Sequence, residues 1–153
     1  MSVGSICTRS IDLADAEETI HAAAYRLRAR KVGTLVILDR ANRPVGILTD
    51  RDLVVRAVAQ GKDPGQTRVG EVMTRNPTTI SEATPIEQAL TLMRSGGFRR
   101  IPVVASDDSL VGLVSLDDIL SLLAEEFTQV GALVEKEMPT GTRTTRPPGR
   151  YES

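Results

Sequence analysis

Apolar residues recur along the chain with two spacings, one typical of helices and the other of strands. Ile20, Ala23, Ala24 and Leu27 occupy positions i, i+3, i+4 and i+7, and a segment beginning at Ile86 repeats that order. This spacing places the apolar side chains on one face of an amphipathic helix. The pattern therefore predicts a helix after residue 19 and another after residue 85.

Short runs rich in β-branched and other apolar residues predict strands between these helices. They cover residues 34–38, 44–48, 100–104 and 110–114, with extended stretches expected near 10–13 and 77–80. A further helix is expected to begin near Asp50, and another near Leu116, which keeps near-helical spacing to about residue 137. Each half of the chain thus reads strand–helix–strand–strand–helix, which is an α/β (α+β) arrangement.

The same elements occur twice because the sequence repeats itself at one fixed interval. Val45-Gly46 recurs as Val111-Gly112, and Thr8-Arg9 recurs, at the same interval, as Thr74-Arg75. A repeat of this length indicates a duplicated structural unit, and one such unit is too small to be comfortably stable alone. The predicted domains are a first repeat with its linker, a second repeat, a helical extension and a disordered tail, at 1–66, 67–126, 127–138 and 139–153.

Composition narrows the class of protein without identifying it. The chain has 153 residues, of which 41% are hydrophobic and only 3% aromatic, and its net charge is −1. Neither charge nor aromatic content is typical of a nucleic-acid binder. The single Cys7 cannot form an internal disulfide, and no apolar run is long enough for a signal peptide or a membrane span. A cytoplasmic location is expected.

The repeat carries one polar motif twice, at the end of a predicted strand. Thr49 is followed three residues later by Asp52, and Ser115 by Asp118. This spacing is that of a capping box, which satisfies free N–H groups at a helix start. The same groups could also face an anionic phosphate, while the carboxylate accepts hydrogen bonds from sugar hydroxyls. The residues alone leave both interpretations open.

The strings PVGILTDRDLV and LVGLVSLDDIL, together with RRIPVV and VMTRNPTTI, resemble a tandem pair of cystathionine-β-synthase-type (CBS) domains, the Bateman module. The resemblance covers roughly residues 3–126. It implies two CBS repeats packed with pseudo-two-fold symmetry and an adenine-nucleotide site in the cleft between them. It also implies that Asp52 and Asp118 hold ribose, with Thr49 and Ser115 beside them.

The resemblance extends to several further side chains of the expected sites. Arg99 and Arg100 stand where family members often carry basic residues that contact phosphate, whereas the matching positions of the first repeat are Gly33-Thr34. Two unequal sites are therefore expected. Arg51 is a further phosphate candidate. The adenine is expected to lie against apolar side chains, for which Ile80, Ile101 and Ile47 are the candidates.

We expect a regulatory, non-enzymatic module that senses AMP, ADP or ATP and passes a conformational change to an unidentified effector protein. Mg²⁺ could accompany the nucleotide, and NAD and S-adenosylmethionine are the lesser alternatives. One histidine, His21, and one cysteine give no metal set or nucleophilic pair, and the chain has no P-loop. The resemblance implies a homodimer. The alternatives are a structural or interaction dimer without a nucleotide, and a weak nucleic-acid binder.

Overall fold

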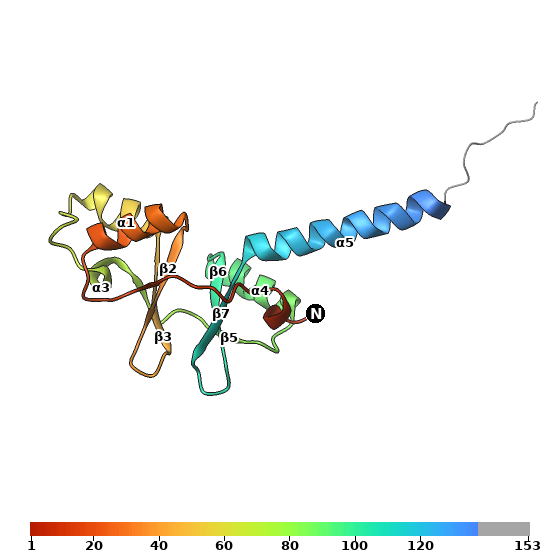
Figure 1. The fold of residues 1–153 in the computed structure, drawn as a ribbon, viewed down its shortest axis with the longest axis horizontal. Helices are drawn as coiled ribbons and strands as arrows, with labels where there is room; N and C mark the ends of the chain where they lie inside the picture. Colours follow the sequence, from red (N-terminus) through yellow and green to blue (C-terminus); the bar gives the residue numbers. More distant parts are fainter. Residues whose placement is uncertain (138–153) are drawn as a thin grey trace, which may run out of the picture. The chain divides into compact units, whose positions relative to one another are not determined.

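The computed structural model describes residues 1–137 and divides the chain into Met1–Leu120 and a unit that begins at Ser121. The first unit holds both sheets described below (Figure 1). Among the described residues, no helix combines the length and hydrophobicity that a membrane crossing requires. The predicted tail, 139–153, lies outside the described residues.

The first repeat is built on a four-stranded sheet in the order β1-β2-β3-β4. Its strands are β1 (Leu13–Ala14), β2 (Thr34–Leu38), β3 (Pro44–Thr49) and β4 (Thr74–Arg75). β1 runs parallel to β2, whereas the β2–β3 and β3–β4 pairs are antiparallel. The helical segments that accompany this sheet are α1 (Ile20–Arg30), α2 (Asp50–Arg56), η2 (Val58–Gln60) and α3 (Val69–Val72).

The second repeat has a three-stranded sheet in the order β5-β6-β7. It comprises β5 (Ile80–Ser81), β6 (Arg100–Val104) and β7 (Leu110–Ser115), accompanied by η1 (Val3–Ser5), α4 (Ile86–Gly96) and α5 (Leu116–Glu137). β5 is parallel to β6, and β6 is antiparallel to β7, as in the first repeat. The predicted order of elements and the mixed α/β fold with two tandem repeats are confirmed.

Local sequence explains why the long helices begin and end where they do. The Thr19 hydroxyl accepts a hydrogen bond from the N–H of Ala22, 3.2 Å away, and so caps α1. α4 follows Pro85 and ends at Gly96; the next residue, Gly97, has a φ of 69°, which suits a residue without a side chain. Most of the apolar face predicted for each helix is buried, but Ala24 is exposed and its counterpart Leu90 is half-buried. The buried residues are Ile20, Ala23 and Leu27 in α1, and Ile86, Ala89 and Met93 in α4.

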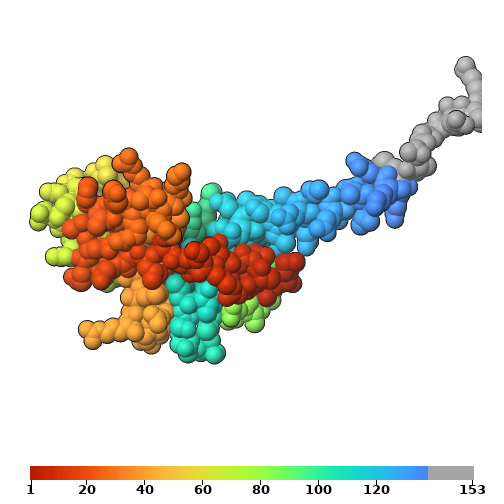
Figure 2. All heavy atoms as spheres, viewed as in Figure 1, coloured from red at the N-terminus to blue at the C-terminus, as the bar shows by residue number. Residues whose placement is uncertain are grey.

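The segment that leads into each repeat packs against the other repeat. Thr8 bonds to Leu113 of β7 in both directions, each N···O distance being 2.9 Å. Thr74, the counterpart of Thr8 in the second copy of the repeat, pairs in the same way with Ile47 of β3. The N-terminal residues therefore belong by packing to the second sheet, and Figure 2 shows them, in red, lying against residues of the second repeat.

The residues that precede Thr8 and Thr74 also make matching hydrogen bonds to the other repeat. Val3 donates to the Thr84 carbonyl at 2.9 Å, and Val69 donates to the Glu18 carbonyl at 2.9 Å. Because these hydrogen bonds join matching positions of the two repeats, the pseudo-symmetry extends to the backbone. The sequence pattern did not predict β4 or α3, and it placed β1 and β5 slightly too early, since elements of two to four residues carry no periodicity of their own.

Candidate functional site

The motif of the first repeat lies at the junction of β3 and α2. The Thr49 hydroxyl accepts a hydrogen bond from the Asp52 N–H at 3.2 Å, and the Asp52 Oδ2 accepts one from the Thr49 N–H at 2.9 Å. The remaining oxygen, Oδ1, lies 3.8 Å from Nε of Arg56. The capping box predicted from the spacing is thus formed, and it leaves one carboxylate oxygen for other partners.

The second motif has the same geometry between β7 and α5. The Asp118 N–H donates to the Ser115 hydroxyl at 3.1 Å, and the Ser115 N–H donates to Oδ2 of Asp118 at 2.9 Å. Both motifs therefore cap helices, whether or not they also bind a ligand. The occurrence of the motif in both repeats is therefore explained by helix capping even without a ligand.

A cavity of about 630 Å³ lies beside the first motif. Three chain segments line it: the β3–α2 junction, the segment from β4 to Thr78, and the turn between α4 and β6. The first two accompany the sheet of the first repeat and the third belongs to the second repeat, so the cavity lies between the repeats. Its lining includes Thr49, Arg51, Asp52, Arg99 and Arg100 among the predicted residues. Its volume is typical of a small-molecule pocket.

The lining of this cavity carries more positive than negative charge. The basic residues are Arg51, Arg56, Arg99 and Arg100, and the acidic ones are Asp50 and Asp52. Arg56 forms an ion pair with Asp52 and also donates to the Val72 carbonyl at 3.0 Å. An excess of guanidinium groups in a partly enclosed cavity favours an anionic occupant.

Arg100 reaches from the second repeat onto the first. One terminal nitrogen of its guanidinium group lies 3.5 Å from the point that a Cβ at Gly33 would occupy, and Oδ2 of Asp50 lies 3.4 Å from the same point. The absent side chain of Gly33 therefore leaves the space in which Arg100 approaches the start of α2. Sequence reasoning paired Gly33 with Arg99 as matching positions, but it could not show that this part of each repeat meets the other.

Most of the other predicted site residues lie outside this cavity. Ile80 is buried in the core, with 7% of its surface exposed, and it does not line this cavity. Ile101 is fully buried, whereas Ile47 does line the cavity. Ser115 and Asp118 also lie outside the lining. Sequence reasoning missed Asn76 and Thr78, which line the cavity. Both lie in the segment that leads into the second repeat, and they come near the first motif only because this segment pairs, through β4, with β3 of the first repeat.

Cys7 lies close enough to the second motif for the charge of Asp118 to act on its thiol. Burial raises the pKa of the Cys7 thiol above its usual value; the charge of Arg9 acts against this, and those of Glu82 and Asp118 add to it. Arg9 itself pairs with Glu82 at 2.8 Å, so its charge is partly engaged there. Asp52 shares its cavity lining with four arginines, whereas Ser115 and Asp118 do not belong to that lining.

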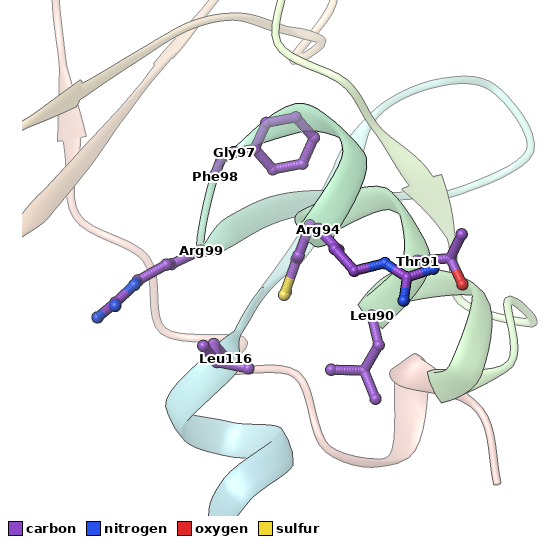
Figure 3. A pocket seen from close by; sticks show the side chains of 8 residues that line it. Leu90, Thr91, Arg94, Gly97, Phe98, Arg99 and Leu116 are labelled. Carbon is purple, nitrogen blue, oxygen red and sulfur yellow. The ribbon is translucent and has the colours of Figure 1, made fainter.

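A second cavity, of about 510 Å³, lies along α4 and the first residue of α5. Leu90, Met93, Phe98 and Leu116 give it an apolar lining. Leu90, Phe98 and Leu116 are labelled in Figure 3. Figure 3 also shows the side chains of Arg94 and Arg99 pointing in different directions, so that they do not converge on one anion. Neither capping motif contributes a hydroxyl or carboxylate to this second cavity. We therefore regard the cavity beside Thr49 and Asp52 as the candidate site.

The pairing of sheets and the repeated strand-end motif match a known family. The family model for the CBS domain matches residues 3–58 and 69–125, two segments offset by the interval of the internal repeat. The chain belongs to the CBS domain family. An uncharacterized protein of Methanopyrus kandleri, MK0525, is 34% identical over 138 residues, which are 90% of this chain and 68% of that protein.

Solved structures show the same CBS pair. The CBS domain pair of protein MJ0100, in complex with 5′-methylthioadenosine and S-adenosyl-L-methionine, is 30% identical with a TM-score of 0.73, and the match covers 80% of this chain and 99% of that one. A protein with CBS domains from Burkholderia ambifaria has a TM-score of 0.75 at 24% identity, with 80% of this chain and 93% of that chain covered. At that identity the likeness concerns the fold alone.

Proposed function

We propose that this CBS pair is a regulatory sensor that binds an adenine nucleotide, AMP, ADP or ATP, in the cavity between its repeats. The observation that carries the proposal is the cavity that joins the Thr49–Asp52 motif of one repeat to Arg99 and Arg100 of the other. The complex of the MJ0100 pair with two adenosine-containing ligands supports the ligand class.

The charge of the cavity favours nucleotides over the two ligands of that neighbour. Four arginines and two aspartates line it, so a ligand carrying phosphate gains attraction there. 5′-Methylthioadenosine carries no phosphate, and S-adenosylmethionine carries a positive sulfonium. NAD would present phosphates to the same arginines, but its second nucleoside must also find room. Mg²⁺ bound to ATP would enter with the phosphates rather than through ligands of the protein.

Binding of ribose is compatible with the capping role of Asp52. Its Oδ2 is occupied by the Thr49 N–H, and its Oδ1 lies 3.8 Å from Arg56, beyond a good hydrogen bond. A carboxylate oxygen has two lone pairs, so Oδ1 can accept from a sugar hydroxyl without loss of the cap.

The Ser115–Asp118 motif is proposed as a second and weaker site. The residues that correspond there to the arginine pair are Gly33 and Thr34, which carry no charge. Within the described residues, the Thr34 hydroxyl is buried and has no hydrogen-bond partner. A neutral hydroxyl attracts phosphate less strongly than a guanidinium does, so unequal affinities are expected.

Regulation would follow from the position of the ligand between repeats. A nucleotide that contacts Asp52 and Arg100 together stabilises the arrangement in which these two residues lie close. Such differential binding shifts a conformational equilibrium, which an effector protein or a second copy in a homodimer can detect. The proposal includes no catalytic step.

Isothermal titration of the full chain with AMP, ATP and adenosine tests the proposal. Arg100→Gln should weaken ATP binding by roughly 10-fold to 100-fold, because a charge-assisted hydrogen bond is lost, while changing adenosine binding little. Asp52→Asn retains an oxygen for the cap and should weaken all three ligands. Asp118→Asn is the matched control, and it should leave the tighter site unchanged.

Several results would contradict the proposal. No heat with millimolar AMP and ATP would favour a structural or interaction dimer. Equal loss of affinity in the Asp52 and Asp118 variants would contradict the inequality of the sites. Chromatography of the nucleotide after prolonged incubation should recover it unchanged, and a salt-dependent gel shift with RNA would instead favour the nucleic-acid alternative.

A further inference from the structure

Asp50 brings to the cavity beside Thr49 and Asp52 a carboxylate that takes no part in the capping box. Its Oδ1 accepts a hydrogen bond from the N–H of Arg51 at 2.8 Å, which orients the side chain. Within residues 1–137, the remaining oxygen accepts no hydrogen bond and Asp50 forms no ion pair. Its charge therefore acts on whatever enters the cavity.

The free oxygen of Asp50 lies on the side from which Arg100 approaches. Oδ2 of Asp50 is 3.4 Å from the point that a Cβ at Gly33 would occupy, and a terminal nitrogen of Arg100 is 3.5 Å from the same point. Arg100, proposed to hold phosphate, thus stands near a carboxylate before any ligand arrives. A phosphate that binds Arg100 must come close to this carboxylate, and the two like charges repel each other.

Asp50 differs in this respect from Asp52, the other acidic residue of the cavity. Oδ2 of Asp52 accepts from the Thr49 N–H, and its Oδ1 lies 3.8 Å from Nε of Arg56, so partners on the protein offset its charge. The second repeat has Leu116 at the position that matches Asp50, so its motif carries no corresponding carboxylate. Among the two motifs, only the first combines arginines with a carboxylate that lacks a partner in the described chain.

We propose that Asp50 determines how much phosphate charge the cavity accepts, because its carboxylate opposes each added phosphate and restrains the preference of the arginines for ATP over AMP. The choice of ligands rests on the proposed nucleotide function. ATP carries more negative charge than ADP, and ADP more than AMP, so the repulsion grows in that order. Adenosine is uncharged and does not experience it.

Isothermal titration of the full chain with adenosine, AMP and ATP measures this restraint. Asp50→Asn removes the charge and keeps an oxygen that can accept from the Arg51 N–H. It should tighten ATP binding by roughly 10-fold and AMP binding by roughly 3-fold, because the effect of one carboxylate increases with the charge of the ligand. Adenosine binding should not change. Both gains should shrink as the salt concentration rises, since ions screen charges that are exposed to solvent.

Two further variants separate the charge of Asp50 from its shape and from the net charge of the protein. Asp50→Glu keeps the charge and should keep the wild-type ratio of the ATP and AMP affinities. Glu87→Gln is the matched control, since it removes one negative charge from the first turn of α4, outside the cavity lining, and it should change none of the affinities. A gain in ATP affinity as large as that of Asp50→Asn in either variant would overturn the proposal.

Inorganic tripolyphosphate distinguishes the role of Asp50 from the proposed nucleotide function, because it carries phosphate charge without adenine or ribose. Asp50→Asn should tighten its binding more than that of inorganic phosphate. If tripolyphosphate binding tightens in this way while neither protein binds a nucleotide, the role of Asp50 is supported and the nucleotide function is overturned. Equal affinities of the wild type and Asp50→Asn for ATP and for tripolyphosphate would overturn the role of Asp50, as would the absence of binding of either compound to both proteins.

Discussion

The N-terminal segment packs closely against Gly112 of the second sheet, and a substitution at Gly112 tests how much this packing stabilises the fold. A Cβ at this position would lie 2.6 Å from Sγ of Cys7 and 3.2 Å from the Thr8 carbonyl oxygen. The first distance is far shorter than van der Waals contact, so the thiol must move. The Thr8 backbone cannot give way easily, because it is held to Leu113 by hydrogen bonds of 2.9 Å in both directions. Gly112→Ala should therefore lower the free energy of unfolding by about 2–3 kcal/mol.

Gly46 provides the matched control, since it occupies the same place in the first repeat. A Cβ there would lie 2.4 Å from Sδ of Met73, and its other near neighbours belong to the same side chain. A methionine has three rotatable bonds and adapts its shape more readily than a backbone carbonyl does. Gly46→Ala should therefore cost only about 1 kcal/mol, although its closest contact is the shorter of the two.

Urea denaturation followed by circular dichroism measures both costs, provided that the slopes of the transitions stay equal. Cys7→Ala combined with Gly112→Ala should recover about 1 kcal/mol relative to the sum of the single changes, because the thiol clash is gone while the carbonyl contact remains. If Gly46→Ala proves as costly as Gly112→Ala, or the double variant shows no recovery, the argument from side-chain freedom is wrong.

Two further predictions concern the caps and the thiol. Thr49→Ala and Ser115→Ala should each lower the free energy of unfolding by about 1 kcal/mol in the same urea assay, since each removes a helix cap, and an unchanged midpoint would show that the cap contributes nothing. Cys7 should react with iodoacetamide at pH 8 more slowly than free cysteine does, because its raised pKa leaves less thiolate at that pH. Mass spectrometry follows the alkylation, and a rate equal to that of free cysteine would contradict the burial of the thiol.

The sequence was informative wherever a segment carries its own periodicity. The apolar spacing of α1 and α4 predicted their buried faces, and the runs at β2 and β6 predicted strands, because the burial of such segments depends on patterns within them. The capping boxes at Thr49 and Ser115 were also predictable, since the hydrogen bonds join residues three positions apart. The fixed interval between matching positions indicated the duplication directly.

The candidate site depended on contacts that no local pattern contains. Arg100 and Asp52 line one cavity although they belong to different repeats. Ile80, expected beside the adenine, is buried and does not line this cavity. The sequence identified Arg99 and Arg100 as phosphate candidates but did not show that they line the same cavity as Thr49 and Asp52. The pattern within a strand does not reveal which part of the other repeat will pack against it.

By itself, then, the sequence determined the two repeats, their main helices and strands and the caps at the ends of β3 and β7. Only the tertiary structure decided that each leading segment crosses to the other repeat and that Arg99 and Arg100 line the same cavity as the Thr49–Asp52 motif. The physical reason is that helix faces and caps are set by neighbours close along the chain. A cavity between repeats is instead set by how two complete sheets pack, which depends on all their side chains together.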